Sequence, residues 1–190
     1  MNKIKIFLAG TDDVKFILEN LEEKLRLTDY EPIWFHKKFD VLNENAMEEC
    51  LINVKNCDRL ILVLKERYGL PYKNKEKYAD GSYKSSITEE EFMTAFKAEK
   101  PILVFLYRDS YVQSGIYHKN KMGDVAVTKE QFERLKLKGQ IGLFEFIERM
   151  QHLEKDGKKN IRWIEPFVST RDIIEQIKFC EKKVKFDFKR

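Results

Sequence analysis

Three consecutive glutamates, Glu89 to Glu91, lie between a polar and an apolar segment in the stretch SSITEEEFMTAF. A carboxylate in such a place can act as a nucleophile or stabilise positive charge that develops on a substrate. A glutamate can equally help to start a helix. Thr88 and Glu91 have the spacing of a capping box, in which a Thr hydroxyl accepts a hydrogen bond from a free helix N–H. From the residues alone, the structural role of Glu91 is the commoner one.

Other candidate ligand contacts follow two apolar runs. Gly10, Thr11 and Asp12 come directly after KIKIFLA, where a glycine permits either a plain turn or close approach of the backbone to a ligand, and Asp12 can also cap the next helix. Arg67 and Tyr68 follow DRLILVLKE. An arginine there can hold a phosphate or form a surface salt bridge, and a tyrosine can stack on a base or stay in a solvated loop.

Apolar runs alternate with segments of helical spacing along the chain. The runs predict strands at KIKIFLAG, PIWFH, DRLILVLKERYG, PILVFLY and IRWIEPFV. Helical spacing predicts helices over Val14 to Leu25, NENAMEECLINVKNC, Thr88 to about Glu99, a region including LFEFIERMQHLE, and TRDIIEQIKFCEKKV. This alternation predicts an α/β fold with a mainly parallel sheet of about five strands.

Two long segments lack an apolar period and are predicted as loops: LPYKNKEKYADGSYKSS, which has the character of a lid, and RDSYVQSGIYHKNKMGDVAV. Ligands of parallel α/β sheets bind outside the carboxyl ends of the strands. That rule places AGTDD, KERYG, the first loop, the start of the Glu91 helix and YRDS on one rim.

Length and composition favour one folded domain over residues 1–190. The 36 Lys and Arg are nearly matched by 32 Asp and Glu, so the net charge of +4 suits anionic small molecules and argues against nucleic acid. No apolar segment is long enough for a membrane helix, and the opening reaches charged residues too early for a signal peptide. We therefore expect a cytoplasmic protein without membrane contacts. Three cysteines without a C-x-x-C pair suit a reducing compartment.

Several established motifs are missing from the sequence. It has no G-x-x-x-x-G-K-[ST] phosphate loop, no G-x-G-x-x-G fingerprint and no nucleophile elbow. The three histidines, His36, His118 and His152, are scattered without the spacing of metal ligands. We predict no metal and no required cofactor.

Three segments together resemble a known family: FLAGTD, NCDRLILVLKERYG and SSITEEEFMTAFKAEKPILVF. The family is a domain of unknown function within the nucleoside deoxyribosyltransferase and TIR superfamily. The resemblance covers about residues 1–110, and residues 111–190 match only as further α/β elements that complete the same domain. It implies a single flavodoxin-like, TIR-like domain with helices on both faces of the sheet.

The resemblance also implies an activity, the cleavage of an N-glycosidic bond in a nucleoside or in NAD. The attacking glutamate of the deoxyribosyltransferases matches Glu91, and Ser86 and Thr88 match the polar residues of the same motif. Ser85 and Ile87 stand where that motif has Asp and Gly. The form Ser-Ile-Thr-x-x-Glu, preceded by Arg-Tyr-Gly, fits the uncharacterised family instead.

The leading expectation is a nucleoside or nucleotide N-glycosidase that hydrolyses NAD, with Glu91 catalytic and Gly10, Thr11, Asp12, Arg67, Tyr68, Ser86 and Thr88 binding the substrate. The resemblance further suggests a homo-oligomer that acts with a protein partner in bacterial anti-phage defence. The alternative is a non-catalytic signalling or assembly module that binds a nucleotide or a protein.

Overall fold

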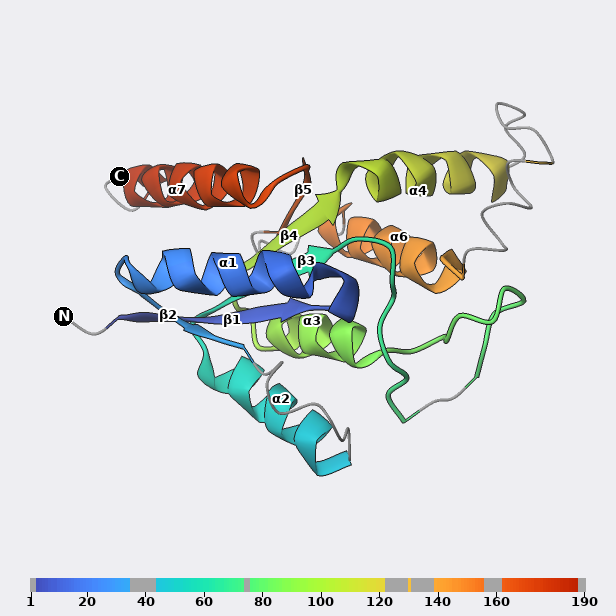
Figure 1. Cartoon of the computed structure of the whole chain (residues 1–190), viewed down its shortest axis with the longest axis horizontal. Coiled ribbons are helices and arrows are strands. Elements are labelled where there is room, and N and C mark those ends of the chain that lie inside the picture. The colour runs from blue at the N-terminus through green and yellow to red at the C-terminus, as the bar shows by residue number, and fades with distance from the viewer. Residues whose placement is uncertain are drawn as a thin grey trace.

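Five parallel strands form the central sheet of the computed structural model, which describes residues 3–34, 44–73, 76–121, 130, 139–155 and 162–187. The strand order is β2-β1-β3-β4-β5 (Figure 1). The strands are β1 (Ile4–Gly10), β2 (Tyr30–Ile33), β3 (Arg59–Leu64), β4 (Ile102–Tyr107) and β5 (Arg162–Phe167). This order and the parallel pairing give a flavodoxin-like α/β domain. The alternation of elements predicts the parallel α/β sheet, and the family resemblance implies its flavodoxin-like arrangement.

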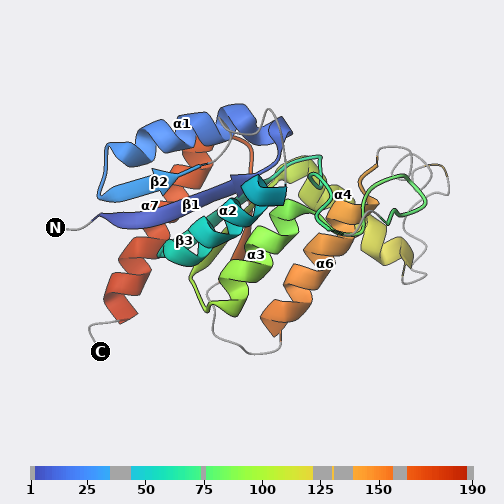
Figure 2. The same ribbon diagram turned by 90° about the horizontal axis from the view of Figure 1, so that it is seen from below.

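Helices cover both faces of the sheet (Figures 1 and 2). One face carries α1 (Lys15–Arg26), which follows a 3-10 turn, η1 (Asp12–Val14), and α7 (Thr170–Asp187). Figure 2 shows the helices of the other face side by side. These are α2 (Glu44–Asn56), α3 (Ile87–Lys97) and α6 (Ile141–Lys155), and α4 (Arg108–Lys121) packs on α6 beyond the end of β4.

The continuous apolar run of β3 is explained by its burial on both sides. Leu60, Leu62 and Leu64 pack into the core beneath α2, α3 and α6, whereas Ile61 and Val63 pack into the core beneath α1 and α7. Alternate side chains of a strand point to opposite faces, so a central parallel strand needs apolar residues at every position. The sheet therefore separates two cores that meet only through its backbone.

Two predicted strands have different bounds in the structure. β2 begins at Tyr30 and ends at Ile33, so Trp34 follows the strand, and Phe35 and His36 lie outside the described residues. β3 ends at Leu64 rather than at Gly69. The chain leaves the sheet there, and the backbone N–H groups of Glu66 and Arg67 bond to a carboxylate outside it, as described below.

The predicted loop RDSYVQSGIYHKNKMGDVAV was wrong over its first 14 residues, which form α4, and its last part, MGDVAV, lies outside the described residues. Its apolar residues give no helical period: Tyr111 and Val112 are exposed, while Tyr117 is buried. The helix is held by polar contacts instead, since the Tyr117 hydroxyl and the Lys121 ammonium bond to Glu145 of α6. Periodicity detects helices that bury an apolar stripe, and α4 buries little of one.

Within the described residues, no helix combines the length and the apolar character that crossing a membrane requires.

Gly10 is explained by packing. A Cβ at this position would lie 2.8 Å from the Val63 carbonyl oxygen and 2.8 Å from Val14 Cγ2, because α1 passes close over the end of β1. We expect Gly10→Ala to lower the free energy of unfolding by about 1–3 kcal/mol through overpacking. Gly115→Ala in α4 is the matched control, since nothing lies within 4 Å of the added Cβ.

The control should be neutral or stabilise by about 0.5–1 kcal/mol, the gain of alanine over glycine in a helix. Urea unfolding of both variants measures the difference. Equal stability of the two variants would show that the structure at the end of β1 adjusts to the added methyl group without losing stability.

Candidate functional site

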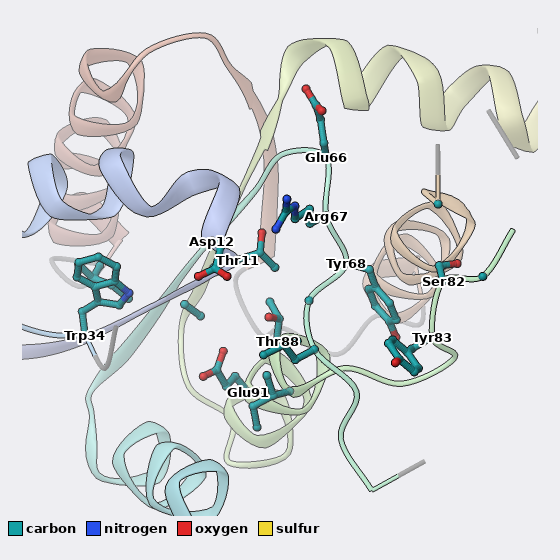
Figure 3. Close-up of a pocket in the computed structure, with 18 of the residues that line it drawn as sticks. Thr11, Asp12, Trp34, Glu66, Arg67, Tyr68, Ser82, Tyr83, Thr88 and Glu91 are labelled. Atoms are coloured by element: carbon teal, nitrogen blue, oxygen red, sulfur yellow. The ribbon is translucent and has the colours of Figure 1, made fainter. Parts of the chain in front are cut away.

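A cavity of about 540 Å³ opens at the carboxyl edge of the sheet. It lies beside the ends of β1 and β3, where the strand order reverses, which is the usual ligand position in open α/β sheets. Figure 3 shows side chains from the end of β1, the segment after β3, the segment before α3 and α3 itself around one space. Parts of the chain that are distant in sequence therefore share one pocket: residues 7–12, Trp34, residues 66–70, the segment from Asp80 to Glu91, and Gly139.

The cavity brings together the residues that the sequence singles out, with one exception. Its lining includes Gly10, Thr11, Asp12, Arg67, Tyr68, Thr88 and Glu91. Ser86 is fully buried and does not line the cavity. The lining also includes Tyr83, a loop tyrosine that could stack on a base, and residues that the sequence did not single out, among them Trp34, Gly69, Asp80 and Ser82.

Ser86 is the N-cap of α3, and this corrects the predicted capping box. Its hydroxyl oxygen accepts a hydrogen bond from the Glu89 N–H at 3.1 Å, and the helix begins at Ile87. Thr88 and Glu91 therefore lie inside the helix, in its first and second turns. A capping role for Glu91 is excluded by this geometry, because an N-cap side chain bonds only to the first free N–H groups.

Glu91 is a buried acid that faces the cavity (Figure 3). Glu91 is only 7% exposed. In the part of the chain that the structure describes, its carboxyl group forms no hydrogen bond and no ion pair. Burial raises the pKa of Glu91 to about 8. In the ligand-free protein at pH 7 the carboxyl group is therefore mostly neutral, whereas our reasoning from the sequence required an ionised carboxylate.

Thr88 supplies a second buried polar group one turn before Glu91 on α3. The residue is 2% exposed, and its hydroxyl has no hydrogen-bond partner among the described residues. Gly69 leaves that hydroxyl uncovered, because a Cβ at Gly69 would lie 2.8 Å from Thr88 Oγ1. With φ of +104°, Gly69 also has a backbone conformation that disfavours any side chain.

Asp13 fixes the segment that follows β3 against the end of β1. Its Oδ2 accepts hydrogen bonds from the Glu66 and Arg67 N–H groups at 2.7 and 3.1 Å, and its Oδ1 accepts one from the Thr11 hydroxyl. From the sequence, Asp13 is placed on the rim only as part of AGTDD, with no role of its own. Its partners lie 53 and 54 residues away, which no local pattern indicates.

Tyr68 is fixed by a charged network that reaches α6. Arg149 Nε and Nη2 donate to the two carboxylate oxygens of Glu89 at 2.9 and 2.8 Å, and the Tyr68 hydroxyl donates to the same carboxylate. Burial raises the pKa of Tyr68 most, and the Glu89 carboxylate raises it further. The hydroxyl of Tyr68 is thus committed to the protein, which leaves its ring to line the cavity.

A hairpin over residues 76–84 forms one wall of the cavity. Lys77 pairs with Tyr83 across it, and Asp80 bonds internally to Ser82. The tip also caps α6: Asp80 Oδ2 accepts from the Ile141 N–H at 2.9 Å, and Ser82 Oγ accepts from the Gly142 N–H at 3.0 Å. The predicted lid is therefore docked on a helix terminus, where a carboxylate is favoured by the helix dipole.

The mouth of the cavity carries groups suited to a nucleotide. Arg67 is exposed, and Figure 3 shows its guanidinium group near Thr11 and Asp12. Neither hydrogen bonds nor ion pairs to this guanidinium group occur among the described residues. Trp34 and Tyr83 place aromatic rings on the cavity lining. In the same described ranges, no group of three His, Cys, Asp or Glu side chains could hold a metal ion.

Comparison with known proteins agrees with the sequence resemblance at the level of the family. The profile described as Domain of unknown function (DUF4062) matches residues 5–179. The chain belongs to this family. A search of curated proteins found no match. The DUF4062 match includes every described residue that lines the cavity, so the pocket is part of the family's domain.

The buried acid predicts an unusual effect on stability. Because the pKa of Glu91 is near 8 when folded and about 4.5 when unfolded, the folded state binds the proton more tightly, and stability falls as pH rises from about 4.5 to 8. Glu91→Gln removes this loss. We expect equal stability at pH 4 and a variant more stable by roughly 3–5 kcal/mol at pH 9, since each pKa unit corresponds to about 1.4 kcal/mol.

Urea unfolding at both pH values measures this difference, with Glu90→Gln as the control. Glu90 directly precedes Glu91 on α3 and does not line the cavity, so its substitution should change the free energy of unfolding little at either pH. A Glu91→Gln variant less stable than the wild type at pH 9 would mean that the ionised carboxylate has a stabilising partner.

Proposed function

We propose that this chain binds a nucleoside or nucleotide in the cavity and cleaves its N-glycosidic bond with Glu91, with NAD as the leading substrate. The observation that carries the proposal is the buried carboxyl group of Glu91, which faces the cavity and has no partner among the described residues. The resemblance to the nucleoside deoxyribosyltransferase and TIR superfamily supports it, as does the position of the pocket at the strand-order reversal.

Electrostatics favours a substrate that brings positive charge to Glu91. Burial raises the pKa of this carboxyl group to about 8, and none of the described residues places a cation beside it. A cationic group placed beside it would favour ionisation and lower the pKa again. The nicotinamide ring of NAD carries a positive charge next to the bond that would break, so binding NAD would itself produce the carboxylate that the reaction needs.

The reaction can be written with this carboxylate as the only charged catalyst. The bond between the sugar C1′ and the nicotinamide nitrogen breaks, and its electron pair leaves with nicotinamide, which becomes neutral. Positive charge moves to C1′, where Glu91 stabilises it or bonds to it. Water then adds to C1′ and loses a proton, which gives ADP-ribose, nicotinamide and H⁺. Neither a metal nor a redox partner enters this balance.

The other lining residues suit the remaining parts of such a substrate. Arg67 at the mouth can pair with a diphosphate, since a guanidinium group binds phosphate oxygens through two parallel hydrogen bonds. Trp34 and Tyr83 can stack on a base. Thr88 adds a hydroxyl beside Glu91 that can bond to a sugar hydroxyl.

One observation favours a second candidate, a nucleotide-binding module without turnover. At neutral pH Glu91 is mostly protonated in the free protein, and a neutral carboxylic acid can donate a hydrogen bond to a base or sugar without attacking it. Either candidate is compatible with the setting that the resemblance suggests, a homo-oligomeric effector that works with a protein partner in anti-phage defence.

The first test is release of free base from NAD, NADP and a panel of nucleosides, followed by chromatography. We expect the wild-type protein and Glu90→Gln to release nicotinamide from NAD, and Glu91→Gln to be at least about 10³-fold slower, because Gln keeps the shape but cannot form the carboxylate. The assay should include high protein concentrations, at which oligomers form.

Absence of product from both wild type and Glu91→Gln would reject the glycosidase. Calorimetric binding of NAD without turnover would then support the module, whereas absence of binding would reject both candidates.

The pH profile tests the electrostatic argument separately. The dependence of kcat/KM on pH reports groups of the free enzyme. If the ionised form of Glu91 reacts, kcat/KM for NAD should rise about tenfold per pH unit below about 8 and level off above it. The profile of kcat should level off at lower pH, because the bound cation lowers the pKa of Glu91. A kcat/KM that is flat from pH 6 to 9 would contradict this role.

A further inference from the structure

A second cavity, of about 400 Å³, lies at the opposite edge of the sheet from the candidate site. It is bordered by the first residues of β1, β2 and β3, by the end of α1 and by the middle of α7. All strands run in one direction, so the edge where they begin is separated from the edge that carries Glu91 by the length of the sheet (Figure 1). The two cavities share no lining residue.

The interior of this cavity is aliphatic and its rim is basic. Its apolar lining consists of Ile4, Leu25, Leu27, Ile174 and Ile177. Among the described lining residues, three cationic side chains, Lys24, Arg59 and Lys178, accompany a single acid, Asp29. Lys24 and Lys178 are exposed, and neither forms an ion pair with the described residues. The cavity is thus matched in charge to an anion with an apolar body.

Tyr30 provides an independent indication of a ligand. The residue lines the cavity and is 5% exposed, and its hydroxyl is buried without a hydrogen-bond partner among the described residues. Leaving a buried hydroxyl unpaired destabilises the folded protein, and a phenylalanine would avoid that loss. The hydroxyl has almost no accessible surface in the ligand-free protein, so an acceptor atom of a ligand would reach it only after the Tyr30 side chain turns toward the cavity.

We propose that this second cavity binds a small anionic amphiphile, an unbranched aliphatic chain that ends in a carboxylate. The chain would lie among the isoleucine and leucine side chains, and the carboxylate would face the basic rim and the Tyr30 hydroxyl. The volume lies within the range of about 300–1,000 Å³ typical of small-molecule sites. The ligand is a free molecule, since a cavity between a helix and a sheet encloses a single chain better than it contacts a bilayer surface.

The first experiment uses the full chain and calorimetric titration below the micelle concentration of each probe. Hexanoate, octanoate and decanoate should bind about fourfold tighter for each added methylene, the factor that corresponds to about 0.8 kcal/mol for its burial. At the same chain length, octanoate should bind at least about tenfold tighter than octanol, and octylammonium should not bind. Equal affinity for octanoate and octylammonium would overturn the proposal.

Variants locate the binding and separate it from the candidate active site. Lys24→Glu combined with Lys178→Glu should weaken octanoate at least about tenfold, whereas Lys15→Glu, at the other end of α1, should not change it. Glu91→Gln should also leave the affinity unchanged. Because the three lysines are exposed, these substitutions spare the core, and melting curves check that each variant folds.

Tyr30→Phe tests whether the hydroxyl contacts the ligand, because removing the hydroxyl of a purely structural tyrosine would not change the affinity for octanoate. The variant should melt higher than the wild type without ligand, because the unpaired hydroxyl is gone, and should bind octanoate about tenfold more weakly. A Tyr30→Phe variant that melts lower and binds octanoate normally would show that the hydroxyl serves the fold.

An experiment with lipid vesicles distinguishes binding of a free ligand from binding to a membrane surface. Flotation with phosphatidylglycerol vesicles should leave the protein in solution, and binding to vesicles without binding to octanoate would replace the proposed ligand with a lipid surface.

Discussion

The parallel pairing of β1 with β3 is the constraint on which the remaining structure depends. Both strands run in one direction and end together, with Gly10 opposite Val63, so the segments that leave them must begin at the same edge. Asp13 then joins these two segments through three hydrogen bonds. The close passage of α1 over the end of β1, which the absent side chain of Gly10 permits, fixes Asp13 where those donors converge. A cavity between two strand ends follows from this arrangement.

The cavity contains groups that lower stability, and its walls contain groups that raise it. Glu91 and Thr88 keep polar atoms inside the protein without partners among the described residues. The surrounding walls are fixed by satisfied polar contacts, which join Tyr68 to Glu89 and Arg149 and join the 76–84 hairpin to the first turn of α6. Unpaired groups inside a rigid frame are typical of binding sites, where the ligand supplies the missing partners.

The fold could be predicted from the sequence because its strands are buried on both faces and its helices are mostly amphipathic. The apolar run of β3 and the spacing of Leu18, Leu21 and Leu25 in α1 each identify one element. α4 was missed because its contacts with α6 are polar. Residues of the candidate site that directly follow a strand could be identified from the sequence. Asp13 and Arg149 were missed, because their hydrogen-bond partners lie more than 50 residues away in sequence.

The three glutamates of α3 show why a motif alone could not assign their roles. Two signatures overlap in this stretch, Ser86-x-x-Glu89 and Thr88-x-x-Glu91, and both fit a capping box; the structure places the cap at Ser86. Each residue of a helix is rotated by about 100° around the helix axis from the one before it, so the side chain of Glu91 is rotated by about 200° from that of Glu89. The two side chains therefore point to nearly opposite sides of the helix. Glu89 therefore faces Arg149 on α6, and Glu91 faces the cavity. The glutamate that forms the ion pair and the glutamate without an ion pair among the described residues are two positions apart on one helix, so the direction of each side chain around the helix axis decides its role.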